Sequence, residues 1–270
     1  QTVTILSDNR TLDPERFRME HGLSVLLQSG TLEILLDTGA SDLFVRHAEK
    51  LDLDLSGVDY VFLSHGHADH AGGLRTFLEL NRKARVLVSR EAVGGQFFST
   101  RGGMHDITAS WPLDLMKGRM VPTEGSPEIA GGIHVITRIP HSHGIPSGNR
   151  HLLRECDGRP VPDDFRHEMA LYSDGFLFTG CAHNGLENIL EACPWPVHTV
   201  LGGFHLLDAK GEESYETAEE LTGLAVRLLR SYPGTVFYTG HCTGDKAFET
   251  LQTVMGDRIR RFSCGMRIAC

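Results

Sequence analysis

The residue types best suited to chemistry in this chain occur together in one short stretch, His65-Gly66-His67-Ala68-Asp69-His70. In an extended loop, side chains two residues apart project to the same side, so His65 and His67 are placed to bind one cation. Asp69 and His70 point elsewhere, which suits a second cation beside the first. Neutral imidazole and carboxylate groups are ligands for zinc, iron(II) or manganese. The stretch therefore predicts a divalent-metal site.

The segments on either side of this stretch predict how it is positioned. Residues 58–63 are apolar and β-prone, which is typical of a buried strand. Residues 72–83 carry apolar side chains close to helical spacing, at Leu74, Phe77, Leu78 and Leu80. The polar residues therefore lie on a strand-to-helix loop at the mouth of a sheet. A polar loop with chance histidines is the alternative, but four ligand-type residues at this spacing favour a metal site.

Motifs elsewhere in the chain point to a known family. The pattern His-x-His-x-Asp-His after a strand resembles the metallo-β-lactamase superfamily, and three further motifs resemble its Asp-Thr-Gly turn, a later strand-end motif and its last metal-ligand motif. They are Leu35-Leu36-Asp37-Thr38-Gly39, Phe178-Thr179-Gly180 and Thr239-Gly240-His241. The resemblance implies an α/β (α+β) fold, a four-layer αββα sandwich with two sheets face to face and helices outside. The expected order of strands and helices agrees with this fold.

Four other stretches resemble one branch of this superfamily, the dihydropteroate-synthase-like or methanopterin-biosynthesis branch. They are Glu20-His21-Gly22-Leu23-Ser24, Thr179-Gly180-Cys181-Ala182-His183-Asn184-Gly185, Gly202-Gly203-Phe204-His205-Leu206 and Gly240-His241-Cys242-Thr243-Gly244. The resemblance extends over residues 2–256, nearly the whole chain. Because one fold hosts many chemistries, the branch motifs say less about the reaction than about the fold.

The resemblance also implies a ligand set for two metal ions. His65 and His67 would bind the first ion, and Asp69, His70 and His241 would bind the second. In the family a carboxylate or a hydroxide bridges the two ions. Asp69 is also a candidate catalytic residue. Zinc is the first expectation for both ions, with iron or manganese as alternatives.

Two parts of the chain compete to supply the third imidazole for the first ion. In much of the superfamily this ligand lies in a turn before the Phe-Thr-Gly element, and residues 139–146, with His141 and His143, resemble that turn. The branch instead places its histidine where His183 stands. A four-coordinate site with an open position takes three protein ligands, so only one candidate is needed. We expect His183 to be the ligand and His143, or less favourably His141, to line the pocket as an acid or a phosphate contact.

Other candidate residues around the site have more than one interpretation. Cys181 stands where many superfamily members have a bridging aspartate, so it either binds a metal or leaves water as the only bridge. Asp37 is expected to hold a ligand imidazole, with a helix cap as the alternative. His205 is a candidate catalytic donor near a leaving group or a phosphate, with a buried strand-end histidine as the alternative. His21 and Asn9 resemble substrate-rim residues of the branch.

The length and composition of the chain limit its organisation and partners. Its 270 residues contain no linker, so we expect one domain over 1–270 with irregular insertions near 90–130 and 140–165. A formal charge of −9 disfavours a nucleic-acid partner. No apolar run approaches the roughly 20 residues of a membrane span, so no membrane partner is expected. Six cysteines without paired spacing favour a reduced cytoplasm.

These observations favour an enzyme, a dinuclear metal-dependent hydrolase that acts on a small phosphorylated or pterin-like substrate through a metal-bridging hydroxide. One alternative is a synthase that condenses a dihydropterin with an aminobenzene ribosyl phosphate and uses the same metals. Another is a non-enzymatic sensor that binds a ligand in the metal pocket. Pterin coupling measured against phosphodiester hydrolysis would separate the first two possibilities.

Overall fold

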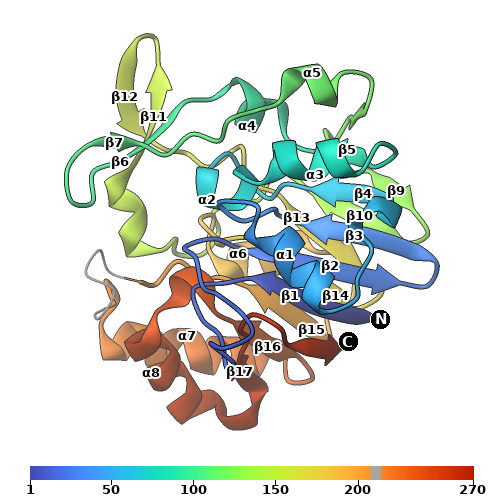
Figure 1. The fold of residues 1–270 in the computed structure, drawn as a ribbon. Helices are drawn as coiled ribbons and strands as arrows, with labels where there is room; N and C mark the ends of the chain where they lie inside the picture. Colours follow the sequence, from blue (N-terminus) through green and yellow to red (C-terminus); the bar gives the residue numbers. More distant parts are fainter. Residues whose placement is uncertain (208–213) are drawn as a thin grey trace.

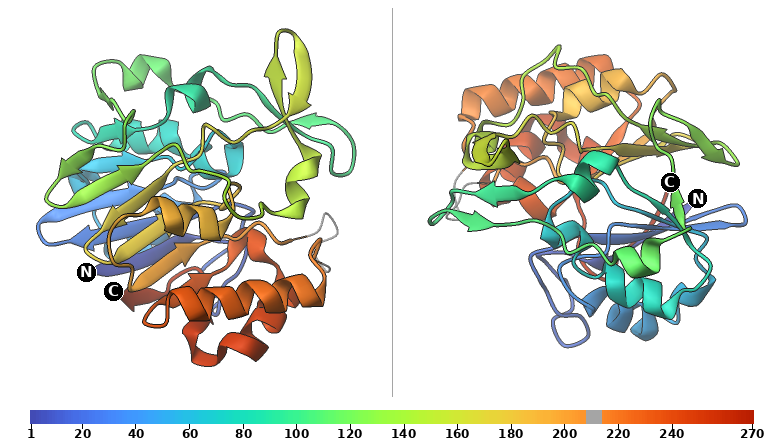
Figure 2. Two further views of the ribbon diagram at one scale, coloured as in Figure 1. Left: turned by 180° about the vertical axis from the view of Figure 1, so that it is seen from behind. Right: turned by 90° about the horizontal axis from the view of Figure 1, so that it is seen from above.

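The computed structural model describes residues 1–207 and 214–270, and it confirms the expected mixed α/β architecture. Two seven-stranded sheets pack face to face, and helices cover the outer face of each sheet (Figure 1). Figure 2 shows the same layers from behind and from above. The N- and C-termini lie close together at one edge, where β1 pairs with β18.

Each of the two packed sheets has seven strands. The first has the strand order β18-β1-β2-β3-β4-β5-β8 and the second has β17-β16-β15-β14-β13-β10-β9. The first is made of β1 (Thr2–Ser7), β2 (Ser24–Ser29), β3 (Leu32–Leu36), β4 (Tyr60–Phe62), β5 (Arg85–Leu87), β8 (Met120–Val121) and β18 (Arg267–Ala269). The second is made of β9 (Glu128–Ala130), β10 (Ile133–Ile136), β13 (Ala170–Ser173), β14 (Phe176–Thr179), β15 (Thr199–Gly202), β16 (Val236–Thr239) and β17 (Ile259–Arg261).

Alternation along the strands explains why the sheets are covered on both faces. In β3, Ile34 and Leu36 belong to the core between the two sheets, whereas Leu35 belongs to the core under the helices. In β4 and the residue after it, Phe62 points inward, and Val61 and Leu63 point outward. Successive side chains of a strand point to opposite faces, so a strand that is apolar throughout needs a packing layer on each side.

The helices form the two outer layers. α1 (Leu43–Lys50) and α3 (Leu74–Leu80) cover the first sheet, and α6 (Leu186–Ala192), α7 (Ala218–Ser231) and α8 (Asp245–Met255) cover the second. The shorter helices are η1 (Leu55–Gly57), α2 (Ala68–Ala71), α4 (Arg90–Gly94), α5 (Leu113–Met116), η2 (Ser147–His151), η3 (His241–Thr243) and η4 (Gly256–Arg258). None of the helices in the described part of the chain has the length and apolar character needed to cross a bilayer.

The two stretches expected to be irregular insertions, near 90–130 and 140–165, pair with one another. They form a third, four-stranded sheet with the order β12-β11-β6-β7. Its strands are β6 (Phe97–Ser99), β7 (His105–Asp106), β11 (Leu152–Cys156) and β12 (Arg159–Pro162). This sheet stands apart from the sandwich on the side of α2 (Figure 1). The pairing of β6 with β11 joins segments about fifty residues apart and has no local signal in the sequence.

Candidate metal centre

The site is built from loops that follow neighbouring strands of the two sheets. Asp37 follows β3, His65 lies between β4 and α2, Cys181 follows β14, His205 follows β15 and His241 follows β16. Parallel strands bring their carboxyl ends to one edge, so residues distant in the sequence meet there.

Several of these loops turn through an uncommon backbone conformation. The φ angle is 55° at Asp37, 54° at Ala182, 51° at His205 and 47° at His241. Left-handed φ values are uncommon for residues other than glycine and cluster at functional sites. The sharp turns point the side chains after each strand back over the sheet edge.

His65, His67 and His183 form what we call the first ligand group. Their ring centroids lie 4.5 Å apart for His65 and His67, 5.0 Å for His65 and His183, and 5.1 Å for His67 and His183. One ligand atom from each lies within 4.8 Å of the other two. All three rings are buried, and none of their Nε2 atoms has a hydrogen-bond partner within residues 1–207 and 214–270.

The contacts of the opposite ring nitrogen, Nδ1, explain why the Nε2 atoms of His65 and His183 carry lone pairs. His183 Nδ1 donates to Asn149 Oδ1 at 3.1 Å. His65 Nδ1 lies 2.8 Å from Ser64 Oγ, and the Ser64 hydroxyl donates to Asp37 Oδ2 at 2.7 Å. The Ser64 oxygen must therefore accept from His65. Such outer contacts fix the tautomer and orientation of metal-binding histidines.

The electrostatic environment keeps the first ligand group uncharged. Burial lowers the pKa of His67 to about 3 and holds the pKa values of His65 and His183 well below their ordinary value. Neutral rings with converging lone pairs suit a divalent cation, which replaces the missing hydrogen-bond partners.

Asp69, His70 and His241 form what we call the second ligand group. Asp69 Oδ2 lies 3.3 Å from His241 Nε2 and 3.6 Å from His70 Nε2, and the two Nε2 atoms are 3.1 Å apart. His70 Nδ1 donates to Asp37 Oδ2 at 2.7 Å, and His241 Nδ1 donates to Asn9 Oδ1 at 2.9 Å. Both Nε2 atoms are then acceptors, and two acceptors this close need a proton or a cation between them.

The charges around the second ligand group favour positive charge at its centre. Burial disfavours a charged His70 ring, but Asp69 and Asp37 raise its pKa to about 9. Despite its burial, Asp69 has a pKa well below the ordinary value because His70, His21 and His241 stabilise the carboxylate. Burial lowers the pKa of His241 to about 4. A divalent ion would supply the charge that a proton on His70 otherwise provides.

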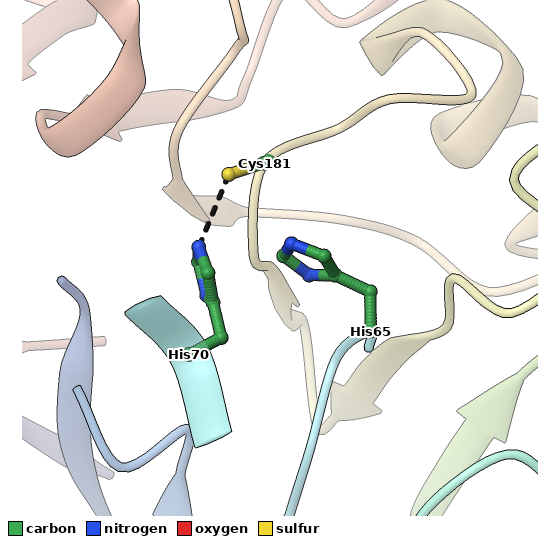
Figure 3. Close-up of side chains that lie close together, drawn as sticks. All are labelled: His65, His70 and Cys181. Atoms are coloured by element: carbon green, nitrogen blue, oxygen red, sulfur yellow. Dashed lines mark hydrogen bonds between the residues drawn. The ribbon is translucent and has the colours of Figure 1, made fainter. Parts of the chain in front are cut away.

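A thiol, not a carboxylate, lies between the two groups. Figure 3 shows His65, His70 and Cys181 converging, with Cys181 Sγ 3.2 Å from His70 Nε2. Cys181 also has ligand atoms of His241 and Cys242 within 4.8 Å. Burial and the neighbouring Cys242 raise the pKa of the Cys181 thiol well above its ordinary value. A nearby cation would oppose that rise and favour the thiolate, which is the metal-binding form.

A cavity of about 580 Å³ opens over both ligand groups, and His67, Asp69, His183 and His241 line it. A second cavity of about 630 Å³ is lined by other residues, including His141 and Asn184, and by none of the six ligand-group residues. Of these two cavities, the one over the ligand groups can therefore admit a substrate to this chemistry.

The comparisons with known proteins agree with this geometry. Residues 18–144 match the family model described as the metallo-beta-lactamase superfamily. A solved structure, Tm1679, a metal-dependent hydrolase of the beta-lactamase superfamily, is 28% identical with a TM-score of 0.81, and covers 100% of this chain and 98% of that chain. Residues 18–144 thus match the metallo-β-lactamase superfamily, and the whole chain is similar to a solved structure of that superfamily.

Two relatives from Methanocaldococcus jannaschii extend the similarity over almost the whole chain. The uncharacterized protein MJ0448 is 28% identical over 254 residues, which cover 92% of this chain and 93% of that protein. A 7,8-dihydropterin-6-methyl-4-(beta-D-ribofuranosyl)-aminobenzene-5'-phosphate synthase is 26% identical over 271 residues, or 92% of this chain and 90% of that protein. A diphosphatase from the PhnP family, 14% identical with a TM-score of 0.56, covers 100% of this chain and 97% of that chain and shares the fold.

The superfamily offers two positions for the third imidazole, and the structure brings His183 to the first ligand group. His143 is exposed, and its Nε2 lies 3.5 Å from Glu191 Oε2 on α6. His141 is exposed as well, and its Nε2 lies 2.6 Å from Asn184 Oδ1. Neither lines the cavity over the ligand groups, so the expectation that His143 or His141 lines the pocket is at odds with the structure. The loop of residues 139–146 runs over α6 because Asn188 binds its backbone.

The other predicted superfamily site residues lie around the two groups. Asp37 accepts from the Ser64 backbone, the Ser64 hydroxyl and His70, and the N-cap of the following helix, α1, is Asp42. His21 is exposed, and its Nε2 lies 3.3 Å from Asp69 Oδ2. Asn9 lies beside both His21 and His241. These contacts place Asp37 beneath the ligand rings and the other two at the rim.

Three further residues of the site were missed by the sequence analysis. Glu168 is buried, and its carboxylate accepts from the backbone N–H groups of His183 and Asn184, both at 2.8 Å. Asn149 donates to the carbonyl of His183 at 2.7 Å, in addition to holding its ring. Arg101 lines the cavity from the β6–β7 loop. The sequence carried a signal for Glu168, because a single charged residue directly precedes the apolar run 169–172. It carried no comparable signal for Asn149 or Arg101.

Proposed function

We propose that this chain is a dinuclear metal-dependent hydrolase that acts on a small phosphorylated or pterin-like substrate. One observation carries the proposal. The buried Nε2 atoms of His65, His67 and His183 converge without partners in the described part of the chain, directly beside the second ligand group. In this proposal each group holds one divalent ion. The nitrogen ligands, together with a thiol between the groups, favour zinc, with iron or manganese as alternatives.

Different residues of the protein would have different roles in hydrolysis. Two bound divalent ions would lower the pKa of water toward about 7 and act as Lewis acids on the substrate. Asp69 presents a carboxylate on the cavity wall, oriented by His21, and would accept a proton from the attacking water. His205 would donate a hydrogen bond to the substrate. Asp37, Asn9 and Asn149 would keep the ligand rings in place.

The size of the cavity and the comparisons support a small substrate. A volume of about 580 Å³ falls in the range of roughly 300–1,000 Å³ typical of small-molecule sites. Tm1679, the structural relative with 28% identity, is described as a metal-dependent hydrolase. The M. jannaschii synthase is named for a ribofuranosyl-aminobenzene 5'-phosphate product that carries both a pterin and a phosphate. Both resemblances are compatible with a phosphorylated or pterin-like substrate.

A synthase is the second candidate, because similarity to the M. jannaschii synthase covers 92% of this chain. Such an enzyme would join a dihydropterin to an aminobenzene ribosyl phosphate and displace a leaving group, with the same ligand groups stabilising the departing anion. The active-site thiols Cys181 and Cys242 also suit a reducing compartment, and we propose the cytoplasm.

The deciding experiment uses purified protein loaded with zinc, iron or manganese. Elemental analysis should give two metal ions per chain, and a phosphoester panel should show hydrolysis that a chelator abolishes. Zero or one ion after reconstitution would contradict the dinuclear proposal. Coupling of pterin to the aminobenzene compound without phosphoester hydrolysis would establish the synthase. Tight ligand binding with neither reaction would establish a sensor.

A further inference from the structure

Arg101 and His205 meet at the cavity wall from two unrelated parts of the fold. Arg101 lies in the loop between β6 and β7 of the third sheet, and His205 follows β15 of the second sheet. Arg101 Nη2 lies 3.0 Å from His205 Nε2 although the residues are 104 positions apart. The His205 ring lies 4.2 Å from that of His183, so this pair borders the first ligand group.

Donor and acceptor chemistry fixes how the His205 ring is protonated. A guanidinium group can only donate hydrogen bonds, so His205 Nε2 must be the acceptor in this contact. The proton of the neutral ring is then on Nδ1. That atom is buried and has no hydrogen-bond partner among residues 1–207 and 214–270. Arg101 therefore leaves His205 with an unused N–H donor inside the cavity wall.

Arg101 itself has unused hydrogen-bonding capacity. Its Nη2 also donates to the carbonyl of Gly148 at 3.1 Å, and its guanidinium lies 5.5 Å from the centre of the Tyr215 ring. Its Nε is buried without a partner, and no carboxylate in the described ranges forms an ion pair with it. A half-buried guanidinium positioned by a carbonyl and a ring, with no carboxylate partner in the described ranges, suits a phosphate oxygen.

We propose that Arg101 and His205 form an oxyanion subsite that binds the phosphate group of the substrate beside the first ligand group. The inference rests on the proposed function and narrows its substrate to one that carries a phosphate ester. Arg101 supplies the positive charge and hydrogen bonds, and it also positions His205 so that Nδ1–H donates to the same group. A ligand atom of His205 also lies within 4.8 Å of those of Cys181 and His183, and in this proposal His205 acts as a neutral donor.

The first test measures binding of inorganic phosphate to the metal-loaded protein by calorimetry. We expect Arg101→Ala to weaken phosphate binding roughly 10-fold to 100-fold and to keep both metal ions, because one charge-assisted contact is lost. Arg101→Lys should restore only part of the affinity, since a point charge replaces a planar fork. The matched control is Arg150→Ala, which removes an exposed guanidinium 4.7 Å from the same Tyr215 ring but outside the cavity. Equal phosphate affinity in Arg101→Ala and the wild type would overturn the subsite.

The second test separates the donor on His205 from its backbone conformation. The φ angle of 51° at His205 is one that asparagine and glycine adopt readily. His205→Asn keeps an N–H donor near the position of Nδ1, whereas His205→Gly removes it. We expect His205→Gly to lose more phosphate affinity than His205→Asn, with metal content unchanged in both. Equal losses would show that Nδ1–H makes no contact, and loss of a metal ion would show that His205 is a ligand.

These tests are independent of turnover. If phosphate binding depends on Arg101 but no phosphoester is hydrolysed, the subsite stands and the hydrolase proposal fails. If phosphoesters are hydrolysed and Arg101→Ala changes neither KM nor phosphate affinity, the hydrolase stands and the subsite fails.

Discussion

The two ligand groups lie side by side yet differ in composition and charge. The first contains only imidazoles, which burial keeps neutral. The second contains the Asp69 carboxylate, lies against the Cys181 thiol and reaches the exposed His21. In the second group the pKa of His70 is raised to about 9, whereas in the first group that of His67 is lowered to about 3.

This difference shows two ways to prepare a metal site. The first group has rigid, deprotonated ligands whose lone pairs already converge, so an ion needs only to displace solvent. The second group has accumulated negative charge that a proton on His70 balances, so an ion must replace that proton. The two positions should therefore differ in proton release and in their response to substitution.

The largest effect should come from removing a ligand of the first group. We expect His183→Ala to lose the first metal ion and to reduce hydrolysis by more than about 100-fold, because loss of a direct ligand should exceed loss of an outer contact. His143→Ala is the matched control, since His143 is exposed beside Glu191, and it should keep both ions. Elemental analysis gives the metal content of both variants, and steady-state kinetics gives their rates of hydrolysis. The opposite pattern, with metal lost only in His143→Ala, would reverse the ligand assignment.

Removing the carboxylate should act mainly on the second group. Asp69→Ala should release the second ion and most of the hydrolytic activity while the first ion remains bound, because the Asp69 carboxylate lies against His21, His70 and His241. Metal content measured during stepwise dialysis against a chelator shows which ion is lost first. Unchanged turnover in this variant would refute the role of Asp69.

Substitutions of the residues that support the ligand rings should change metal affinity differently at the two positions. Asp37 touches Ser64, which supports His65, and also His70, so Asp37→Asn should weaken both metal positions about 10-fold to 100-fold. Asn149 holds the ring and the carbonyl of His183, a ligand of the first group, so Asn149→Ala should weaken the first position alone. Competition with a chromophoric chelator measures both affinities. If Asn149→Ala weakened metal binding at both positions as much as Asp37→Asn does, the two groups would not be supported by different residues, and the prediction would be wrong.

The last prediction concerns the pH dependence of metal binding, with an effect of about tenfold for each pH unit. His70 is protonated at pH 7 in the metal-free protein, because its pKa is about 9, and its proton must leave when Nε2 binds an ion. Affinity at the second position should therefore rise about tenfold per pH unit up to about pH 9. His67, with a pKa of about 3, is already neutral and imposes no such dependence on the first position. Calorimetry in buffers of different ionisation enthalpy counts the released protons, and equal release at both positions would exclude this account.

Local sequence was sufficient for features that depend on nearby residues. The stretch from His65 to His70 lies between a buried strand and a helix, as its flanking apolar patterns predict, because strand and helix periodicity are local properties. The αββα sandwich was an expectation from the superfamily resemblance, with which the order of strands and helices agreed, and the structure confirms it. The sequence motifs also identified the superfamily that the comparisons confirm.

Tertiary structure decided which distant residues meet. His183 and His143 are the same residue type, and the branch motif favoured His183. The packing of residues 139–146 over α6 holds His143 away from the ligand groups. Arg101 reaches His205 because β6 pairs with β11, a register set between segments with no local signal. Periodicity determines the face on which a side chain lies, but contacts between residues 100 positions apart depend on how the sheets pair and pack.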